Sequence, residues 1–166
     1  MEVDVAVLGG GPGGYIAAIR AAQRGARVAC IERAPELGGT CLRIGCIPTK
    51  AWVQTALTLK QAEETFEKLG VRLDGLHLEF AKVNAWKAAV VKQMTQGVAF
   101  LFKTNSVEWI KGTGTFKDAN TIGVEGSEGR ELEVRNHRHG LLPAAHADPA
   151  ARVGSLRRLR GTARAD

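Results

Sequence analysis

The sequence predicts an α/β fold organised around a parallel sheet, and three observations support this. Residues 3–8 are a short apolar run rich in β-branched side chains, which is typical of a buried parallel strand. Residues 15–24 are a run of small, helix-compatible residues that ends at Gly25, a residue suited to a helix C-terminus. Residues 27–31 are a second apolar run of strand length. The order strand, helix, strand predicts a βαβ unit.

A glycine-rich loop directly follows the first predicted strand. Residues 9–14 are Gly-Gly-Gly-Pro-Gly-Gly, in which Gly9, Gly11 and Gly14 fit the pattern G-x-G-x-x-G. The first glycine allows a tight turn, the second lets the backbone approach a pyrophosphate, and the third lets helix and strand pack closely. Glu32 ends the second strand, where a ribose hydroxyl pair is usually bound. We therefore predict a bound dinucleotide. The alternative is a merely glycine-rich turn with Glu32 as an exposed charge.

Two cysteines lie shortly after this unit. Cys41 and Cys46 are separated by four residues, and on an ideal helix this spacing turns the second side chain away from the first. A disulfide between them requires a distorted helical turn, for which Gly45 supplies backbone freedom. Thr40 is expected to cap the helix that follows. The spacing alone also fits two buried, small hydrophobic residues.

The position of the cysteines favours a flavin over a nicotinamide. Cys41 comes only nine residues after Glu32, so a dithiol would lie against the same ligand. A dithiol beside a flavin can pass two electrons to it, whereas a dithiol beside a nicotinamide has no obvious chemistry. A metal site is not predicted, because no other Cys or His lies close by. The predicted cofactor is FAD.

Residues 38–50, taken with the glycine loop and Glu32, resemble the start of a dihydrolipoamide dehydrogenase. That family comprises flavin-dependent disulfide reductases and is related to glutathione and mercuric reductases. The resemblance implies a Rossmann-like FAD-binding domain with a parallel sheet and a small antiparallel β-meander, here incomplete. It places Gly9, Gly11 and Gly14 at the FAD pyrophosphate, Glu32 at the adenosine ribose and Thr40 near the pyrophosphate and flavin.

The same resemblance implies roles for the remaining site residues. Cys46 would face the flavin, and Cys41 would be the interchange thiol toward the dihydrolipoyl substrate. Lys50 would lie near the flavin ring, the alternative being a solvated helix lysine. Gly114 would have its backbone near the adenine, the alternative being a plain β-turn glycine. Cys30 matches no redox position and is predicted to be a buried strand residue.

The middle of the chain predicts two helices and several short strands. Residues 51–69 continue the helix that the cysteines open, with an apolar stripe on one side. Residues 80–103 form a second helix, and its stripe is predicted to be core: Phe80, Val83, Trp86, Val90, Met94, Val98 and Leu101. The segments 107–110, 115–117, 121–124 and 131–134 predict an antiparallel meander.

The resemblance ends near residue 136. We predict residues 1–134 as the N-terminal portion of the FAD-binding domain and residues 135–166 as a basic tail that is disordered or frameshifted. Reading the codons of residues 137–139 one base later can give Ile-Val, which would restore a strand. The alternative is a natural basic tail. The NAD-binding and dimerisation domains of the family are not found in the sequence, which has no second G-x-G-x-x-G.

The net charge of +6 comes almost entirely from the last 32 residues. Residues 1–134 carry 16 Lys and Arg against 15 Asp and Glu, whereas residues 135–166 carry seven Arg and two Asp. The basic segment has no aromatic residue to stack on a base, so no nucleic-acid partner is predicted. No apolar run of about 18 residues predicts a membrane span. No leader precedes the first strand, and we expect a cytoplasmic protein.

The implied activity is that of a dihydrolipoyl dehydrogenase. Electrons would pass from dihydrolipoamide to the Cys41–Cys46 disulfide, then to FAD and then to NAD. The implied partners are the lipoyl domain of a 2-oxo acid dehydrogenase complex and a second copy in a homodimer. The alternatives are an NADPH-driven reductase of the mercuric or glutathione type and a non-catalytic FAD-binding remnant. We expect the 166-residue chain alone to be inactive.

Overall fold

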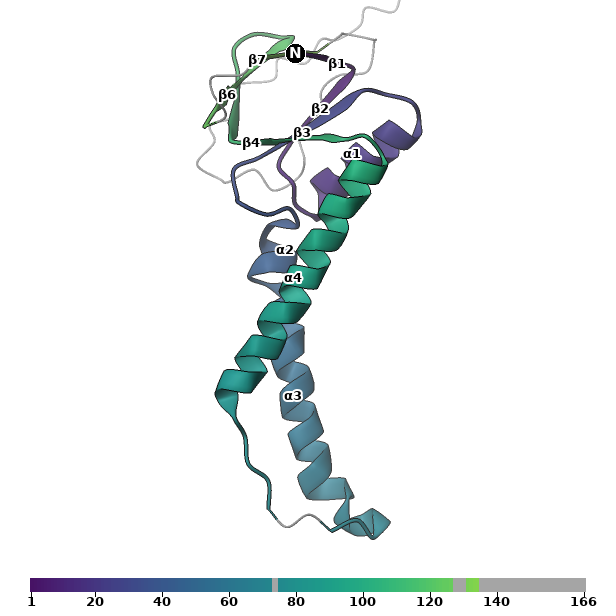
Figure 1. Ribbon diagram of the computed structural model, residues 1–166, viewed down its shortest axis with the longest axis vertical. Helices are drawn as coiled ribbons and strands as arrows, with labels where there is room; N and C mark the ends of the chain where they lie inside the picture. Colours follow the sequence, from purple (N-terminus) through teal and green to yellow (C-terminus); the bar gives the residue numbers. More distant parts are fainter. Residues whose placement is uncertain (73–74, 127–130, 135–166) are drawn as a thin grey trace, which may run out of the picture.

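The computed structural model describes residues 1–72, 75–126 and 131–134, and these form three layers (Figure 1). A parallel three-stranded sheet lies in the middle, helices cover one face, and a second sheet of four strands covers the other. The predicted tail, residues 135–166, lies outside the described residues. The prediction of an α/β fold with a parallel sheet and an antiparallel meander is confirmed.

The parallel sheet contains β2 (Val5–Leu8), β3 (Val28–Glu32) and β4 (Glu108–Lys111), in the order β2-β3-β4. Every residue of β3 is buried, which identifies it as the central strand. α1 (Pro12–Gln23) connects β2 to β3 and begins three residues before the predicted start. Pro12 occupies its first turn, where the missing N–H costs no hydrogen bond.

The second sheet contains β1 (Glu2–Val3), β7 (Glu131–Val134), β6 (Thr121–Glu125) and β5 (Thr113–Phe116), in the order β1-β7-β6-β5. β5, β6 and β7 form the antiparallel meander, and β1 joins β7 in parallel. The predicted meander also included 107–110, which is wrong, because β4 pairs with β3 in the parallel sheet. The chain crosses between the sheets at Gly112, whose N–H donates to the Glu32 carbonyl at 3.0 Å.

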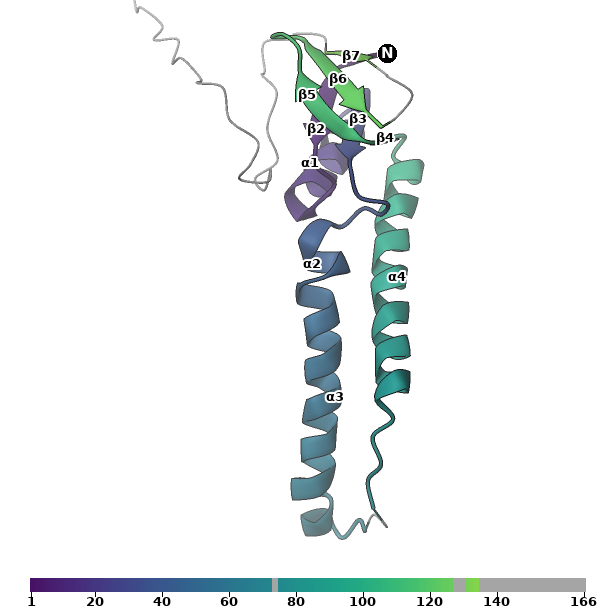
Figure 2. The same ribbon diagram turned by 90° about the vertical axis from the view of Figure 1, so that its left-hand side faces the viewer.

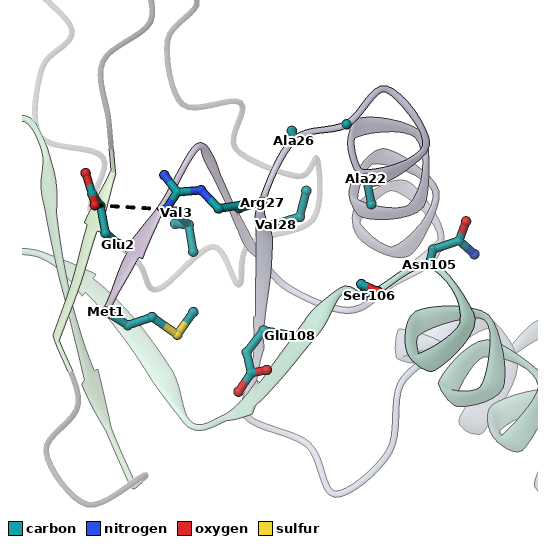
Figure 3. Close-up of a pocket in the computed structure, with 11 residues that line it drawn as sticks. Met1, Glu2, Val3, Ala22, Ala26, Arg27, Val28, Asn105, Ser106 and Glu108 are labelled. Atoms are coloured by element: carbon teal, nitrogen blue, oxygen red, sulfur yellow. Dashed lines mark ion pairs between the residues drawn. The ribbon is translucent and has the colours of Figure 1, made fainter.

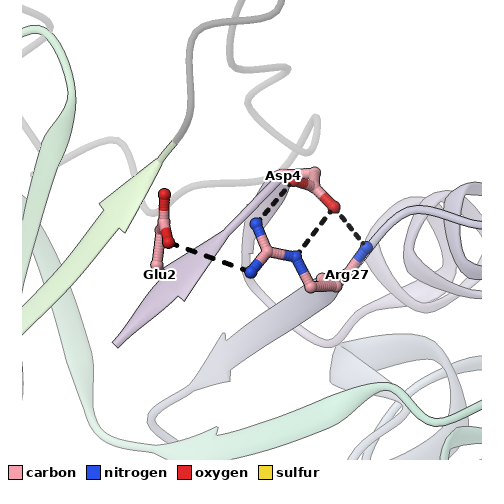
Figure 4. A network of polar contacts seen from close by, with 3 residues as sticks. All are labelled: Glu2, Asp4 and Arg27. Atoms are coloured by element: carbon pink, nitrogen blue, oxygen red, sulfur yellow. Dashed lines mark hydrogen bonds and ion pairs between the residues drawn. The ribbon is translucent and has the colours of Figure 1, made fainter.

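The single strand predicted for residues 3–8 is divided between the two sheets. The break lies at Asp4, whose carboxylate accepts three hydrogen bonds from Arg27, two from the guanidinium and one from the backbone N–H (Figure 4). Glu2 forms a longer ion pair with the same guanidinium at 3.9 Å. Arg27 therefore joins the start of β3 to the point where the first strand changes sheets.

Two apolar clusters fill the space between the layers. One lies between the parallel sheet and the helices and includes Val7, Cys30, Ala18 of α1, and Val98 and Phe102 of α4 (Phe80–Thr104). The other lies between the two sheets, with these buried members: Val3, Ala6, Ala29, Ile31, Ile110, Ile122, Val124 and Leu132.

Two long helices extend together away from the sheets, as both views show (Figures 1 and 2). α3 (Cys46–Thr65) runs outward, the short helix η1 (Glu67–Leu69) and Gly70 end it, and α4 returns. We call residues 52–65 and 80–94 the two-helix projection. Trp52 ties its halves together, since its indole N–H donates to Asn84 Oδ1 at 3.2 Å and Lys87 Nζ lies 4.9 Å from its ring centroid.

The prediction that the whole stripe of α4 is core is wrong for most of its length. Val98 is buried, but the side chains of Phe80, Trp86, Met94 and Leu101 are exposed by 59%, 46%, 39% and 44%. Part of the reason is position, because the sheet lies beneath only the C-terminal part of α4, and elsewhere this helix packs on α3 and α2. In the covered part the buried positions are Thr95, Val98 and Phe102, so the predicted Met94 and Leu101 lie beside the covered face. No helix in these residues is both long and apolar enough to span a bilayer.

Candidate dinucleotide and dithiol site

The glycine loop, residues 9–14, turns directly from β2 into α1 at the carboxyl end of the parallel sheet. The N–H of Gly9 donates to Ile31 O at 2.8 Å, and Gly9 has a φ of +100°, which favours glycine. A Cβ added to Gly14 would collide with the carbonyl oxygen of Gly9, so helix and strand can approach this closely only without a side chain there. The first turn of α1 thus opens onto the loop, an arrangement suited to an anionic group.

The cysteine segment, residues 38–50, starts on this loop. The N–H of Gly38 donates to Gly10 O at 2.8 Å, and a Cβ added to Gly39 would lie 2.7 Å from the Gly11 Cα. α2 (Gly39–Arg43) therefore begins in backbone contact with the residue that caps α1. Gly38 and Gly39 thus approach the glycine loop itself.

Cys41 and Cys46 form a disulfide, with their Cα atoms 4.6 Å apart. Cys41 lies in α2 and Cys46 is the first residue of α3, and the helix is interrupted between them at Ile44 and Gly45. A continuous helix would hold the two Cα atoms about 7.5 Å apart along its axis, beyond comfortable disulfide reach. The predicted distorted turn is present at Gly45, where a Cβ would lie 2.9 Å from Thr40 O.

The two cysteines and the predicted site residues on either side of them, Thr40 and Lys50, differ in exposure. Cys46 is exposed and Cys41 is half-buried against the core. Lys50 is exposed one helical turn after Cys46, so the two share a face of α3. Thr40 is exposed inside α2, and the prediction that it caps the helix is wrong. Gly38 occupies the cap position, in a left-handed conformation without a side-chain hydrogen bond.

Glu32 lies at the carboxyl end of β3 and is only 9% exposed. Its Oε2 accepts the N–H of Gly10 at 2.7 Å, and its Oε1 accepts the N–H of Ala34 at 2.8 Å. The alternative interpretation of an exposed strand-end charge is therefore wrong. Gly10 was missed as a site residue, because the pattern G-x-G-x-x-G treats its position as variable. Here its N–H bonds Glu32 and its carbonyl bonds Gly38.

Gly114 lies within β5, paired with Val124, so the alternative of a turn glycine is wrong. A Cβ added there would press on Leu8 Cδ2 and lie 3.4 Å from Ile31 Cδ1. This glycine allows the second sheet to pack on the carboxyl ends of β2 and β3. The glycine with a positive φ at the crossover is Gly112, at +150°.

Cys30 is fully buried in β3 and unpaired, as predicted. Burial raises the pKa of its thiol to about 12, and the nearby negative charge of Glu32 adds to this. A thiol with such a pKa stays protonated at neutral pH and is a poor nucleophile. It takes no part in the dithiol chemistry.

A surface pocket of about 390 Å³ lies at the opposite end of the sheet (Figure 3). Its lining includes Arg27, Val28 and Glu108, at the amino ends of β3 and β4. Ligands of open parallel sheets bind at the carboxyl ends of the strands, where the glycine loop, Glu32 and the cysteine segment meet. The described residues contain no cluster of His, Cys, Asp and Glu able to hold a metal ion.

Sequence comparisons identify the family to which these residues belong. Residues 3–136 match the family described as pyridine nucleotide-disulphide oxidoreductase. The chain belongs to this family. Its match covers all the described residues except the first two, and so includes the glycine loop, Glu32 and both cysteines.

Curated relatives of this family member are named dihydrolipoyl dehydrogenase. The chain is 48% identical over 124 residues to the protein of Geobacillus stearothermophilus, covering 75% of this chain and 26% of that protein. It is 42% identical over 128 residues to the mitochondrial protein of Schizosaccharomyces pombe, covering 77% and 25%. With the protein of Trypanosoma brucei brucei it shares 43% identity over 151 residues, covering 89% and 31%. The chain thus spans about a quarter to a third of these relatives' lengths.

FAD and NAD are the cofactors of this family. The residues at the carboxyl end of the sheet fit a dinucleotide pyrophosphate. Gly11 and Gly39 leave the mouth of the loop free of side chains, and the first turn of α1 opens onto it. The Glu32 carboxylate retains lone pairs beyond the two that its backbone bonds occupy, so it can also accept a hydroxyl.

Proposed function

We propose that this chain is the FAD-binding, dithiol-bearing portion of a dihydrolipoyl dehydrogenase. One observation carries the proposal: the helix that holds Cys41 begins in backbone contact with the glycine loop. A group held at the loop would therefore lie within a few residues of the disulfide. The names of the relatives support the specific activity.

The reaction of the chain's own residues is a dithiol–disulfide exchange. The two thiols of dihydrolipoamide reduce the Cys41–Cys46 disulfide, which forms the lipoyl disulfide and two cysteine thiols, with two electrons and two protons transferred. Cys41 is the interchange thiol, and Cys46 is the thiol that faces the cofactor. FAD, when bound, would supply the acceptor for these two electrons, and NAD would be the final acceptor in the longer protein.

The residues around the disulfide have supporting roles in this proposal. Gly9, Gly11 and Gly14 shape the pyrophosphate cradle, and Glu32 binds the ribose. Thr40 and Lys50 lie on the helices on either side of the break, and Lys50 is placed to favour the reduced, anionic flavin. Cys46 is exposed, which leaves its side of the disulfide accessible to a flavin. Gly114 supports the adenine end through its backbone.

The wider assignments follow from the same proposal. The lipoyl group would be carried by a 2-oxo acid dehydrogenase complex, the longer protein would be a homodimer, and the compartment would be the cytoplasm. Residues 1–134 are the FAD-binding unit, and residues 135–166 form a basic or frameshifted tail. The sequence has a single G-x-G-x-x-G, so we expect this chain alone not to reduce NAD.

Titration of the purified chain with FAD, followed by flavin fluorescence and absorbance, tests the cofactor assignment. We expect stoichiometric binding and, on addition of dihydrolipoamide, two new thiols per chain. The Cys46→Ser variant is the control. It keeps the glycine loop and should bind FAD, but it cannot form the disulfide and should yield no new pair of thiols. Absence of FAD binding by the folded wild-type chain would refute the proposal.

A second assay separates the alternative candidate. In a reductase of the mercuric or glutathione type electrons flow outward from NADPH, so the reduced Cys41–Cys46 pair should pass electrons to glutathione disulfide or mercuric ion rather than to lipoamide. Binding of FAD without any thiol formation would favour a non-catalytic remnant.

A further inference from the structure

Glu32 has an environment that a ribose-binding residue alone does not require. Its carboxylate is buried, and each oxygen accepts a backbone N–H from a different segment. Oε2 bonds Gly10 in the glycine loop at 2.7 Å, and Oε1 bonds Ala34 at 2.8 Å, at the start of the connection toward α2. Hydrogen bonds to an ionised acceptor are stronger than neutral ones, and stronger still out of water.

The bond to Gly10 continues into the cysteine segment. Gly10 donates its N–H to Glu32 Oε2, and its carbonyl accepts the N–H of Gly38 at 2.8 Å. Gly38 is the residue before α2, and Gly39 rests on Gly11. Two successive hydrogen bonds thus connect the Glu32 carboxylate, through Gly10, to the beginning of the helix that holds Cys41.

The glycines in this hydrogen-bonded series have no side chains that would restrict their backbone conformations. Gly38 and Gly39 have φ values of +112° and +59°, and glycine backbone is freer than any other in the unfolded chain. Their placement must therefore come from contacts. A Cβ on Gly10 would lie 2.6 Å from Leu37 Cδ2 and 3.3 Å from Glu32 Cβ, so the Gly10 peptide is enclosed by side chains of the same two segments.

We propose that Glu32 is a positioning residue for the redox disulfide: its carboxylate fixes the Gly10 peptide and, through it, the start of the Cys41 helix. The role concerns residues within the chain and holds whichever dinucleotide binds. Glu32 would link the ribose end of the site to the dithiol end, so a structural change at one end would alter the structure at the other.

The test compares Glu32→Gln with Glu36→Gln in the ligand-free chain. Both remove one negative charge from the same stretch, but Glu36 is exposed. In Glu32→Gln an amide N–H₂ must face one of the two backbone N–H groups that the carboxylate now bonds. Amide hydrogen exchange by NMR, residue by residue, and the rate of disulfide reduction by a phosphine reductant are measured for each variant.

For Glu32→Gln we expect the protection of the Gly10 and Gly38 amides to fall by about tenfold, as expected for loss of one such hydrogen bond. Protection of β3 and β4 should change little, and the disulfide should be reduced severalfold faster. Glu36→Gln should match the wild type in both measurements. An equal loss of protection throughout the chain, or unchanged Gly38 protection and reduction rate, would overturn the proposal.

If Glu32→Gln does not fold, the wild-type chain itself supplies the test. Reduction of the disulfide frees α2 from α3, and by linkage the Gly38, Gly10 and Ala34 amides should then exchange faster, while those of β4 do not. FAD is absent from every arm, so failure here leaves the proposed function standing, and failure to bind FAD leaves this inference standing. Equal exchange in the oxidised and reduced chains would contradict the positioning role.

Discussion

The part of the molecule that contains the two sheets, which we call the base, and the two-helix projection both contain apolar helical residues. These residues differ between the two regions in how far they are buried. In the base, Phe102 of α4 is 2% exposed beneath the sheet, and glycine backbones at the loop are in direct contact. In the projection, Phe80 of the same helix is 59% exposed. Phenylalanines at the two ends of a single helix thus differ completely in burial. A stripe identifies the face of a helix that is apolar, but its burial depends on what lies opposite.

The close packing of α1 on β2 at Gly14 distinguishes the base from the projection most strongly. In Gly14→Ala the added methyl would collide with the Gly9 carbonyl, and because alanine has no rotatable side chain the backbone itself would have to move. We expect a loss of about 4 kcal/mol or of the fold altogether. Circular dichroism during thermal unfolding measures it.

The matched control for this change lies one residue earlier. A Cβ added to Gly13 meets nothing within 4 Å, and Gly13 is exposed on α1. Gly13→Ala should raise the free energy of unfolding by about 0.5–1 kcal/mol, since alanine favours helix. Equal effects of the two substitutions would show that the close approach of α1 and β2 does not govern stability.

A second pair of variants compares the two ends of α4 directly. Phe102→Ala empties a buried core site and should lower the free energy of unfolding by about 3–5 kcal/mol. Phe80→Ala removes the same ring from an exposed site and should change it by less than about 0.5 kcal/mol. Urea unfolding of both variants measures this. A loss at Phe80 as large as that at Phe102 would mean that the projection is covered in solution.

The smallest expected effect concerns the buried thiol of the base. Because the pKa of Cys30 is raised to about 12 in the folded chain, the native state keeps a proton that the unfolded state loses above about pH 9. Stability is therefore unaffected below that pH and falls between about pH 9 and 12, by about 1.4 kcal/mol per pH unit from this group.

Urea unfolding at pH 7.5, 9 and 10 isolates this contribution when the wild type is compared with Cys30→Ala. The variant has no thiol at this position, so the difference in stability between the two proteins should shrink as the pH rises. A constant difference would contradict the raised pKa. Thiol labelling of the reduced, native chain should correspondingly modify Cys41 and Cys46 but not Cys30.

Much of the site was predictable because local chemistry restricts it. The glycine pattern named Gly9, Gly11 and Gly14, and the spacing of Cys41 and Cys46 called for the distorted turn that the structure has at Gly45. Gly10 and the cap at Gly38 were missed, because their hydrogen bonds join segments about 20 or more residues apart. Such partners leave no signal in a short window of sequence.

The sequence by itself determined the βαβ unit, the glycine loop, the cysteine pair and the extent of the long helices, because backbone sterics and residue periodicity act over a few neighbours. Only the tertiary structure decided that residues 3–8 split between two sheets at Asp4, that Glu32 is buried and accepts two backbone hydrogen bonds, and that α4 is covered at one end only. Burial and hydrogen-bond partners depend on segments distant in the chain, and those meet only when the layers assemble.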